Sequence, residues 1–170
     1  MGTLTTATLK PGDLAPDWTL PDVRRSDHAL SDALGQRGAV LMFVRGMFCP
    51  YCTEQLHQLW EGAGQFELRQ VNLLVITPYG PGAMAIAAAL AGSRIPVLID
   101  GQRQVIGAYG LLHDVPNALD VGYPTGDLVH PTAMVLDAER RIRWLYVGDK
   151  YNDRPTLHDI LEQVDQLPAA

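Results

Sequence analysis

The sequence has little of the positive charge that several large classes of protein need. Only 13 of its 170 residues are lysine or arginine, against 19 aspartates and glutamates, so the formal net charge is -6 at pH 7. Proteins that bind nucleic acid usually carry a basic patch, and anionic membranes attract polybasic segments. The composition therefore argues against both kinds of partner.

Long hydrophobic runs are also missing. The most apolar helical stretch, residues 83–91, falls far short of the roughly 20 residues that a membrane-spanning helix needs. A secretory signal consists of a charged segment followed by an apolar run. Residues 1–9 do not show this pattern. We therefore expect no membrane association and a cytoplasmic, reducing location, with a flexible arm over residues 1–11 and a single domain over residues 12–170.

Cysteine is scarce, and the two that occur, Cys49 and Cys52, are separated by two residues. This excludes a disulfide framework and leaves a catalytic pair or half of a metal site. The histidines are scattered, with no second cysteine pair and no closely spaced histidine pair to complete a zinc site: His28, His57, His113, His130 and His158. We predict neither a metal nor an organic cofactor, and keep a metal-holding module as the alternative.

Strand and helix patterns alternate along the chain. Continuous apolar runs predict buried strands over residues 39–44, 73–76, 97–99 and 133–136, and a hairpin turn over residues 137–141 joins the last of these to a strand over residues 142–147. Apolar spacings of three and four predict a helix over residues 50–70, and an alanine-rich stretch that ends at Gly92 predicts one over residues 81–91. We expect a further short helix over residues 102–108 and a final helix that starts at Pro155. The order predicts an α/β fold with a mixed central sheet covered on both faces. Residues 111–129 form a long connection of a kind that is usually functional or mobile.

Pro50 follows Cys49 directly and suits a first helical position, so Cys49 is the expected N-cap of the helix. Unpaired backbone N–H groups and the helix dipole favour a thiolate there, and such thiols titrate at about 3.5–7.5 instead of about 8.5. Cys52 lies one turn further on the same helix face, close enough for a reversible disulfide. A purely structural staple is the less favoured alternative, since so short a loop constrains the unfolded chain little.

Five segments together resemble the redoxins, the alkyl hydroperoxide reductase and thiol-specific antioxidant (AhpC/TSA) family of peroxiredoxin-like proteins. They are residues 12–20, 30–32, 43–52, 130–137 and 151–155. The resemblance covers residues 11–155 and implies a thioredoxin-like three-layer α/β/α sandwich with an N-terminal extension. It also implies thiol redox chemistry with an external thiol reductant, and dimers are frequent in the family.

The chain departs from the family pattern at two positions. The family's peroxidatic cysteine corresponds to Cys52. In the family a threonine stands three residues before that cysteine, and in this chain the threonine is replaced by Cys49. The family's arginine is replaced by Pro131. Both replaced groups normally position and polarise a peroxide. The Cys-Pro-Tyr-Cys order is similar instead to that of glutaredoxins, which favours disulfide exchange.

Four further residues are candidates for supporting roles. Arg45 could supply the missing positive charge, and a cis bond before Pro131, implied by the resemblance, would present extended backbone beside the sulfurs. Thr53 and Glu54, in the cysteine helix, could hold hydrogen bonds or carry protons, although a solvated face explains Glu54 equally well.

The sequence thus predicts a thiol-disulfide oxidoreductase that cycles Cys49 and Cys52 between dithiol and disulfide. Either Cys49 attacks a disulfide, or Cys52 attacks a peroxide and the resulting sulfenic acid condenses with Cys49. The reductant would be thioredoxin, glutaredoxin or a low-molecular-weight thiol, and a homodimer is expected by analogy with the family. The alternatives are a general disulfide reductase without peroxidase activity and a non-catalytic binding module.

Overall fold

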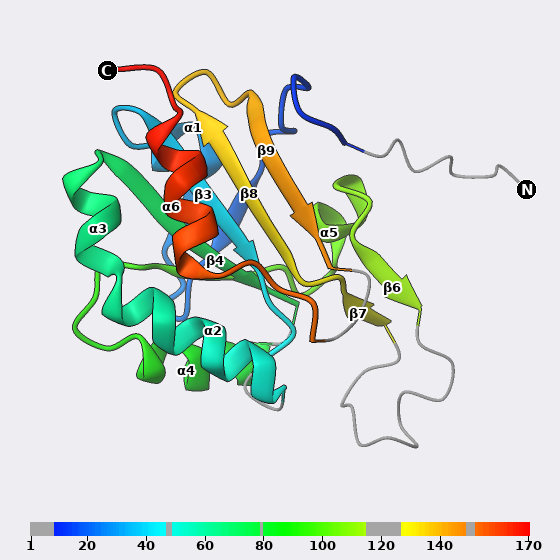
Figure 1. Ribbon diagram of the computed structural model, residues 1–170. Coiled ribbons are helices and arrows are strands. Elements are labelled where there is room, and N and C mark those ends of the chain that lie inside the picture. Colours follow the sequence, from blue (N-terminus) through cyan, green and yellow to red (C-terminus); the bar gives the residue numbers. More distant parts are fainter. Residues whose placement is uncertain (1–8, 47–48, 79, 115–126, 149–151) are drawn as a thin grey trace, which may run out of the picture.

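A five-stranded mixed sheet forms the centre of the molecule (Figure 1). The structure is a computed structural model that describes residues 9–46, 49–78, 80–114, 127–148 and 152–170. The sheet has the order β5-β4-β3-β8-β9, built from Val97–Ile99, Val71–Thr77, Gly38–Phe43, Thr132–Asp137 and Ile142–Val147. β3, β4 and β5 are parallel, whereas β8 and β9 are each antiparallel to the strand before them in the sheet. The predicted mixed sheet and its closing hairpin are confirmed.

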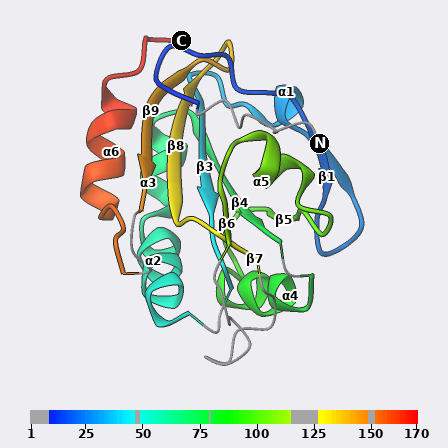
Figure 2. The ribbon, with the colours of Figure 1, turned by 90° about the vertical axis from the view of Figure 1, so that its right-hand side faces the viewer.

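Helices cover both faces of this sheet, as the view along it shows (Figure 2). One face packs against α2 (Pro50–Glu61), α4 (Gly80–Ala89) and α6 (Leu157–Asp165). The other packs against α1 (Leu30–Ala33), α5 (Gln104–Ala108) and the hairpin of β1 (Thr19–Pro21) with β2 (Asp27–Ala29). The three-layer α/β/α prediction is therefore confirmed.

Strand β3 shows why the central run is continuously apolar. Val40 and Met42 join the core beneath α2, whereas Leu41 and Phe43 join the core on the opposite face. All six residues of the strand are buried, since neither face of a central strand meets water. The cysteine segment follows at the end of this strand.

The prediction of one helix over residues 50–70 is wrong, because the helix ends at Gly62. The N–H of Gly62 donates to the carbonyl of Gln58, and α3 (Ala63–Leu68) begins at the next residue. A Cβ atom at Gly62 would lie 2.5 Å from Cδ2 of Leu157, so glycine allows α6 to pack closely here. The apolar spacing continues across the break, which is why periodicity alone does not reveal it.

The last helix begins after Pro155, not at it. Thr156 is the N-cap of α6, and its hydroxyl accepts a 3.1 Å hydrogen bond from the backbone N–H of Asp159. The carboxylate of Asp159 in turn accepts from the backbone N–H of Thr156 at 2.8 Å. This capping box fixes the start of the helix and leaves Pro155 in the extended segment before it.

The two segments predicted to be irregular lie partly outside the described residues, which exclude 1–8 and 115–126. The N–H groups of Gly12 and Ala15 donate to the carbonyls of Ile142 and Arg140, so the chain from residue 12 is held against the start of β9. Within the predicted connection over residues 111–129, β6 (Leu112–Asp114) and β7 (Asp127–Val129) pair antiparallel.

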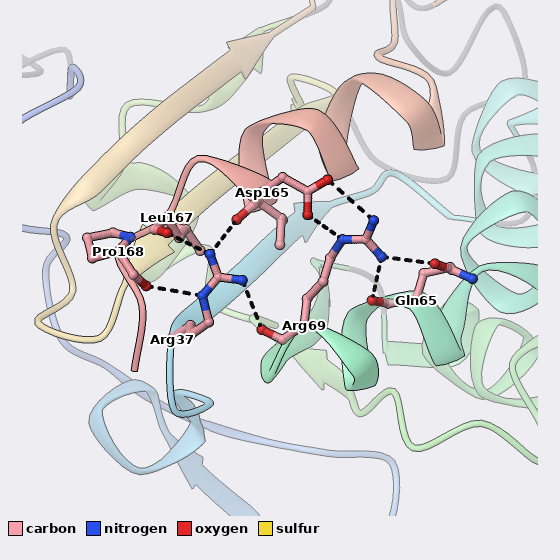
Figure 3. Close-up of polar contacts among 7 residues, drawn as sticks. Arg37, Gln65, Arg69, Asp165, Leu167 and Pro168 are labelled. Carbon is pink, nitrogen blue, oxygen red and sulfur yellow. Dashed lines mark hydrogen bonds and ion pairs between the residues drawn. The ribbon is translucent and has the colours of Figure 1, made fainter.

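Two arginines fasten the end of α6 to the rest of the molecule (Figure 3). Arg69 forms an ion pair with Asp165 at 2.6 Å. The guanidinium of Arg37 donates to four backbone carbonyls, those of Arg69, Val164, Leu167 and Pro168. The last carbonyls of a helix lack partners within the helix. Arg37 supplies donors for the Val164 carbonyl in the last turn of α6 and for the Leu167 and Pro168 carbonyls just after it.

Candidate active site

Cys49 and Cys52 lie at the point where β3 gives way to α2. Cys49 has extended backbone and is the N-cap of α2, Pro50 occupies the first helical turn, and Cys52 follows in that same turn. The predicted N-cap position of Cys49 is confirmed. Both cysteines are free thiols, with only 2% and 0% of their surface exposed.

The guanidinium of Arg154 lies against both sulfur atoms. Its Nη2 donates to Sγ of Cys49 at 3.2 Å and to Sγ of Cys52 at 3.1 Å. Because one nitrogen reaches both sulfurs, the two sulfurs face the same point. Arg154 lies two residues before Thr156, the N-cap of α6, and more than 100 residues from the cysteines along the chain.

This environment lowers the pKa of Cys49 to about 5. The strongest cause is a hydrogen bond from the Cys52 side chain, and burial opposes the shift. The backbone N–H of Cys52 and the positive charge of Arg154 lower the pKa further. Cys49 is therefore a thiolate at neutral pH, the form in which a cysteine is nucleophilic.

The pKa of Cys52 moves in the opposite direction. Its thiol donates a hydrogen bond to Cys49, which favours the protonated form, and burial raises the pKa further. The attraction of Arg154 opposes these effects without overcoming them. The pair thus divides into one thiolate and one thiol, which titrate together because they share a hydrogen bond.

Contacts on both sides hold the segment that carries Arg154. The hydroxyl of Tyr146, on β9, donates to the carboxylate of Asp153, and the side-chain amide of Gln55, on α2, lies 3.5 Å from the carbonyl oxygen of Pro155. Gln55 is a buried polar residue of the cysteine helix. The neighbours of Arg154 are thereby tied to the sheet and to α2.

The structure places Arg45 differently from the prediction. Arg45 follows β3 and is 95% buried, but its Nε donates to the carbonyl of Val129 at 3.2 Å. The positive charge that acts on the sulfurs comes from Arg154. The sequence contained one sign of this, since the segment over residues 151–155 belongs to the family resemblance, but nothing local relates it to the cysteines.

The prediction of a cis bond before Pro131 is wrong, since no peptide bond between described residues is cis. Pro131 is buried just before β8, and its carbonyl accepts a 2.7 Å hydrogen bond from the backbone N–H of Gly148. The ring of His130 lies 3.2 Å from the Gly148 carbonyl. The bond before Pro131 is trans, the form that an X–Pro bond prefers in the absence of other constraints.

Thr53 and Glu54 lie on the exposed side of α2. The hydroxyl of Thr53 donates to the backbone carbonyl of Cys49 at 3.3 Å, which braces the helix start. The carboxylate of Glu54 accepts a hydrogen bond from Gln58, one turn further along the same face. Tyr51, between the cysteines, is 39% exposed.

Neither a metal cluster nor a membrane span is found among the described residues. No three histidine, cysteine, aspartate or glutamate side chains gather there in a way that could hold a metal ion. None of the described helices combines the length and apolar character needed to cross a bilayer.

Comparison with known proteins gives consistent matches. The sequence profile of the AhpC/TSA family matches residues 11–145. A candidate peroxiredoxin of Mycobacterium tuberculosis is 33% identical over 105 residues, which cover 62% of this chain and 66% of the relative. The thiol-disulfide oxidoreductase ResA of Geobacillus thermodenitrificans is 31% identical over 157 residues, covering 92% of this chain and 77% of that protein.

A solved structure has the same fold. The crystal structure of the peroxidoxin BcpB of Mycobacterium tuberculosis superposes with a TM-score of 0.77 at 21% identity. The superposition covers 95% of this chain and 99% of that one. The predicted thioredoxin-like architecture is confirmed over almost the whole chain.

Proposed function

The chain belongs to the AhpC/TSA family, and on this premise we propose that it is a thiol-dependent peroxidase in which Cys49 attacks and Cys52 resolves. The observation that carries the proposal is the contact of Arg154 with both sulfurs, at 3.2 Å and 3.1 Å. A cation and a hydrogen-bond donor at this position favour the thiolate and can polarise a peroxide oxygen.

The order of attack follows from the two opposite pKa shifts. The Cys49 thiolate attacks the distal oxygen of a hydroperoxide, the O–O bond breaks, and the alcohol or water leaves after taking up a proton. The sulfenic acid on Cys49 then condenses with the Cys52 thiol, forming the disulfide and releasing water. Two thiol groups of an external reductant restore the dithiol and become a disulfide themselves.

This order differs from the family pattern, in which the attacking cysteine stands at the position of Cys52. Here the pKa of Cys52 is raised and that of Cys49 is lowered to about 5. Cys52 is buried completely and holds its proton while Cys49 is ionised, so Cys52 is not the cysteine that attacks first. Arg154 takes the place of the family arginine that is Pro131 in this chain.

Stopped-flow oxidation of the reduced protein by hydrogen peroxide tests the activity. We expect a second-order rate well above that of a free thiol, with a pH midpoint near 5 that reflects Cys49. A rate no better than that of a free thiol would rule out the peroxidase.

Trapping with dimedone, which labels sulfenic acids, tests the order of attack. After peroxide treatment, Cys52→Ser should accumulate label on Cys49. In the reduced wild type, brief alkylation at neutral pH should modify Cys49 ahead of Cys52, because the Cys49 thiolate raises the pKa of Cys52. Faster alkylation of Cys52 in the wild type would restore the family order.

Disulfide exchange is the second candidate function. It is favoured by a low-pKa cysteine at a helix N-terminus with a second cysteine three residues later, and by the match to a thiol-disulfide oxidoreductase. Reduction of insulin by the dithiol protein, with slow peroxide oxidation, would support it. Stoichiometric zinc with no thiol turnover would support the binding module instead.

The catalytic cycle defines the partners that we propose. They are a peroxide or disulfide substrate and an external thiol reductant, for which thioredoxin, glutaredoxin and a low-molecular-weight thiol are the candidates. A cytoplasmic location and a homodimer complete the proposal. Gel filtration tests whether the protein is a homodimer. Assays with each reductant in turn show which of them regenerates the dithiol.

A further inference from the structure

The thiolate of Cys49 is the counter-ion that the structure provides for Arg154. Nη2 of Arg154 contacts both sulfurs, whereas its Nε and Nη1 are buried and have no hydrogen-bond partner within the described part of the chain. The neighbouring charges are engaged elsewhere. Asp153 accepts from Tyr146, and Arg45 donates to the carbonyl of Val129.

Oxidation removes this counter-ion. When the Cys49–Cys52 bridge forms, the thiolate and the thiol become two neutral sulfurs, and the guanidinium keeps its charge. Arg154 is half-buried, with Nε and Nη1 shielded from solvent, and a partly buried charge that loses its counter-ion is destabilised. The cost falls on the disulfide state alone, so Arg154 favours the reduced pair.

We propose that Arg154 sets the redox poise of the pair and makes the Cys49–Cys52 bridge a ready acceptor of electrons from monothiols. This inference rests on the proposed function, because it concerns the regeneration step of that cycle. The bridge accepts two electrons from two monothiol molecules, which become their own disulfide. Of the two protons released, one goes to Cys52 and the other to solvent, while Cys49 stays ionised.

The same physics operates in other dithiol proteins, where stabilising the reduced form makes the disulfide more oxidising. The inference therefore predicts the class of reductant. Glutathione-like monothiols would suffice, and a strongly reducing dithiol protein would not be required.

Equilibration with mixtures of glutathione and glutathione disulfide at neutral pH tests this, with the dithiol fraction read by maleimide labelling and mass spectrometry. We expect Arg154→Gln to shift the equilibrium at least tenfold toward the disulfide, equivalent to about 30 mV in reduction potential. Arg154→Lys keeps the charge and should lie between the two. Arg24→Gln, at an exposed arginine of the β1–β2 hairpin, is the charge-matched control and should not differ from the wild type.

The pH dependence of the potential separates a direct charge effect from a structural one. Above the pKa of Cys49, reduction takes up one proton instead of two, so the slope of potential against pH halves. This change of slope should occur near pH 5 in the wild type and at a clearly higher pH in Arg154→Gln. Arg154→Lys should remain close to the wild type.

Equal potentials for the wild type and Arg154→Gln would overturn the inference and leave the thiol cycle intact. Equal potentials for Arg154→Lys and Arg154→Gln would show that the charge is not the cause, and would overturn it as well. If the wild type itself forms no reversible disulfide, the proposed function fails first and the inference fails with it.

Discussion

Gly148 lies in direct backbone contact with Asp153, since a Cβ atom on Gly148 would overlap the carbonyl oxygen of Asp153. The same Cβ would lie 3.2 Å from the carbonyl oxygen of Pro131. Asp153 precedes Arg154, so this close approach positions the backbone next to the residue whose guanidinium contacts the sulfurs. Only glycine leaves the necessary space.

Gly148→Ala should therefore displace Arg154 as well as destabilise the fold. We expect a loss of about 1–3 kcal/mol, typical of overpacking against rigid neighbours. The pKa of Cys49 should also rise, because its cation moves away. Urea unfolding and the pH profile of iodoacetamide labelling measure the two effects.

Gly64→Ala is the matched control for this substitution. Gly64 lies in α3, and a Cβ there would meet nothing within 4 Å. Alanine should be neutral or stabilise the helix by up to about 1 kcal/mol, with no change at Cys49. Loss of stability in Gly148→Ala with an unchanged Cys49 profile would contradict the link between Gly148 and Arg154.

The pKa of Cys49 makes the stability of the reduced protein depend on pH. In the folded chain Cys49 is ionised above pH about 5, whereas in the unfolded chain it remains protonated to its ordinary value of 9.0. Between these limits the unfolded state binds one more proton, so stability rises with pH by at most about 1.4 kcal/mol per unit. The contribution is complete above the unfolded value and is lost as the pH falls to about 5. Cys52 keeps its proton in both states as long as the pH stays well below the ordinary value of 9.0.

Urea unfolding under reducing conditions at about pH 5.5 and about pH 7.5 measures this contribution. The wild type should exceed Cys49→Ser in stability by a larger margin at the higher pH. The comparison with the variant cancels the other titrating groups. An equal margin at both values would show that Cys49 is not ionised in the folded protein.

The sequence predicted the features that neighbouring residues determine. The apolar run of β3 and the N-cap position of Cys49 depend on a few adjacent residues, and both were predicted correctly. Arg154 could not be predicted in the same way, because folding alone brings it to Cys49 from 105 residues away. Arg45 was the nearer candidate along the chain, but its side chain donates to Val129.

Two predictions that were wrong, the uninterrupted helix and the cis bond, both concern places where residues distant in the sequence meet. The helix over residues 50–70 is interrupted where Leu157 packs against Gly62, a contact between distant elements. The expected cis bond before Pro131 came from the family resemblance and not from any physical feature of the residues. The bond is trans, and the strand entry is bound to Gly148 by contacts that a sequence does not display.

On the face of the sheet opposite the cysteines, Tyr109 ties the N-terminal segment to the core. Its hydroxyl accepts a 3.1 Å hydrogen bond from Nε1 of Trp18 and donates a 2.7 Å one to the carbonyl of Pro16. Tyr109→Phe would leave these two groups without their partner, at a cost of about 1–3 kcal/mol. The peroxide rate should not change, since the sulfurs lie in the core of the other face. Thermal unfolding and stopped-flow oxidation test both expectations, and a slower peroxide reaction would mean that the two faces are coupled.

Arg37 offers the sharpest test of what holds α6 in place (Figure 3). Its four carbonyl contacts include one of 2.6 Å to Leu167, just beyond the end of the helix. Arg37→Ala removes all the donors at once and should destabilise the protein by about 1–2 kcal/mol, because water replaces part of what is lost. Arg37→Lys, which keeps the charge but not the planar guanidinium, should recover only part of that loss.

Because Arg154 is held separately by its own segment, the labelling profile of Cys49 should stay near pH 5 in both Arg37 variants. A shift of that profile in Arg37→Ala would show that α6 itself, and not the contacts of residues 153–155, positions the guanidinium at the sulfurs.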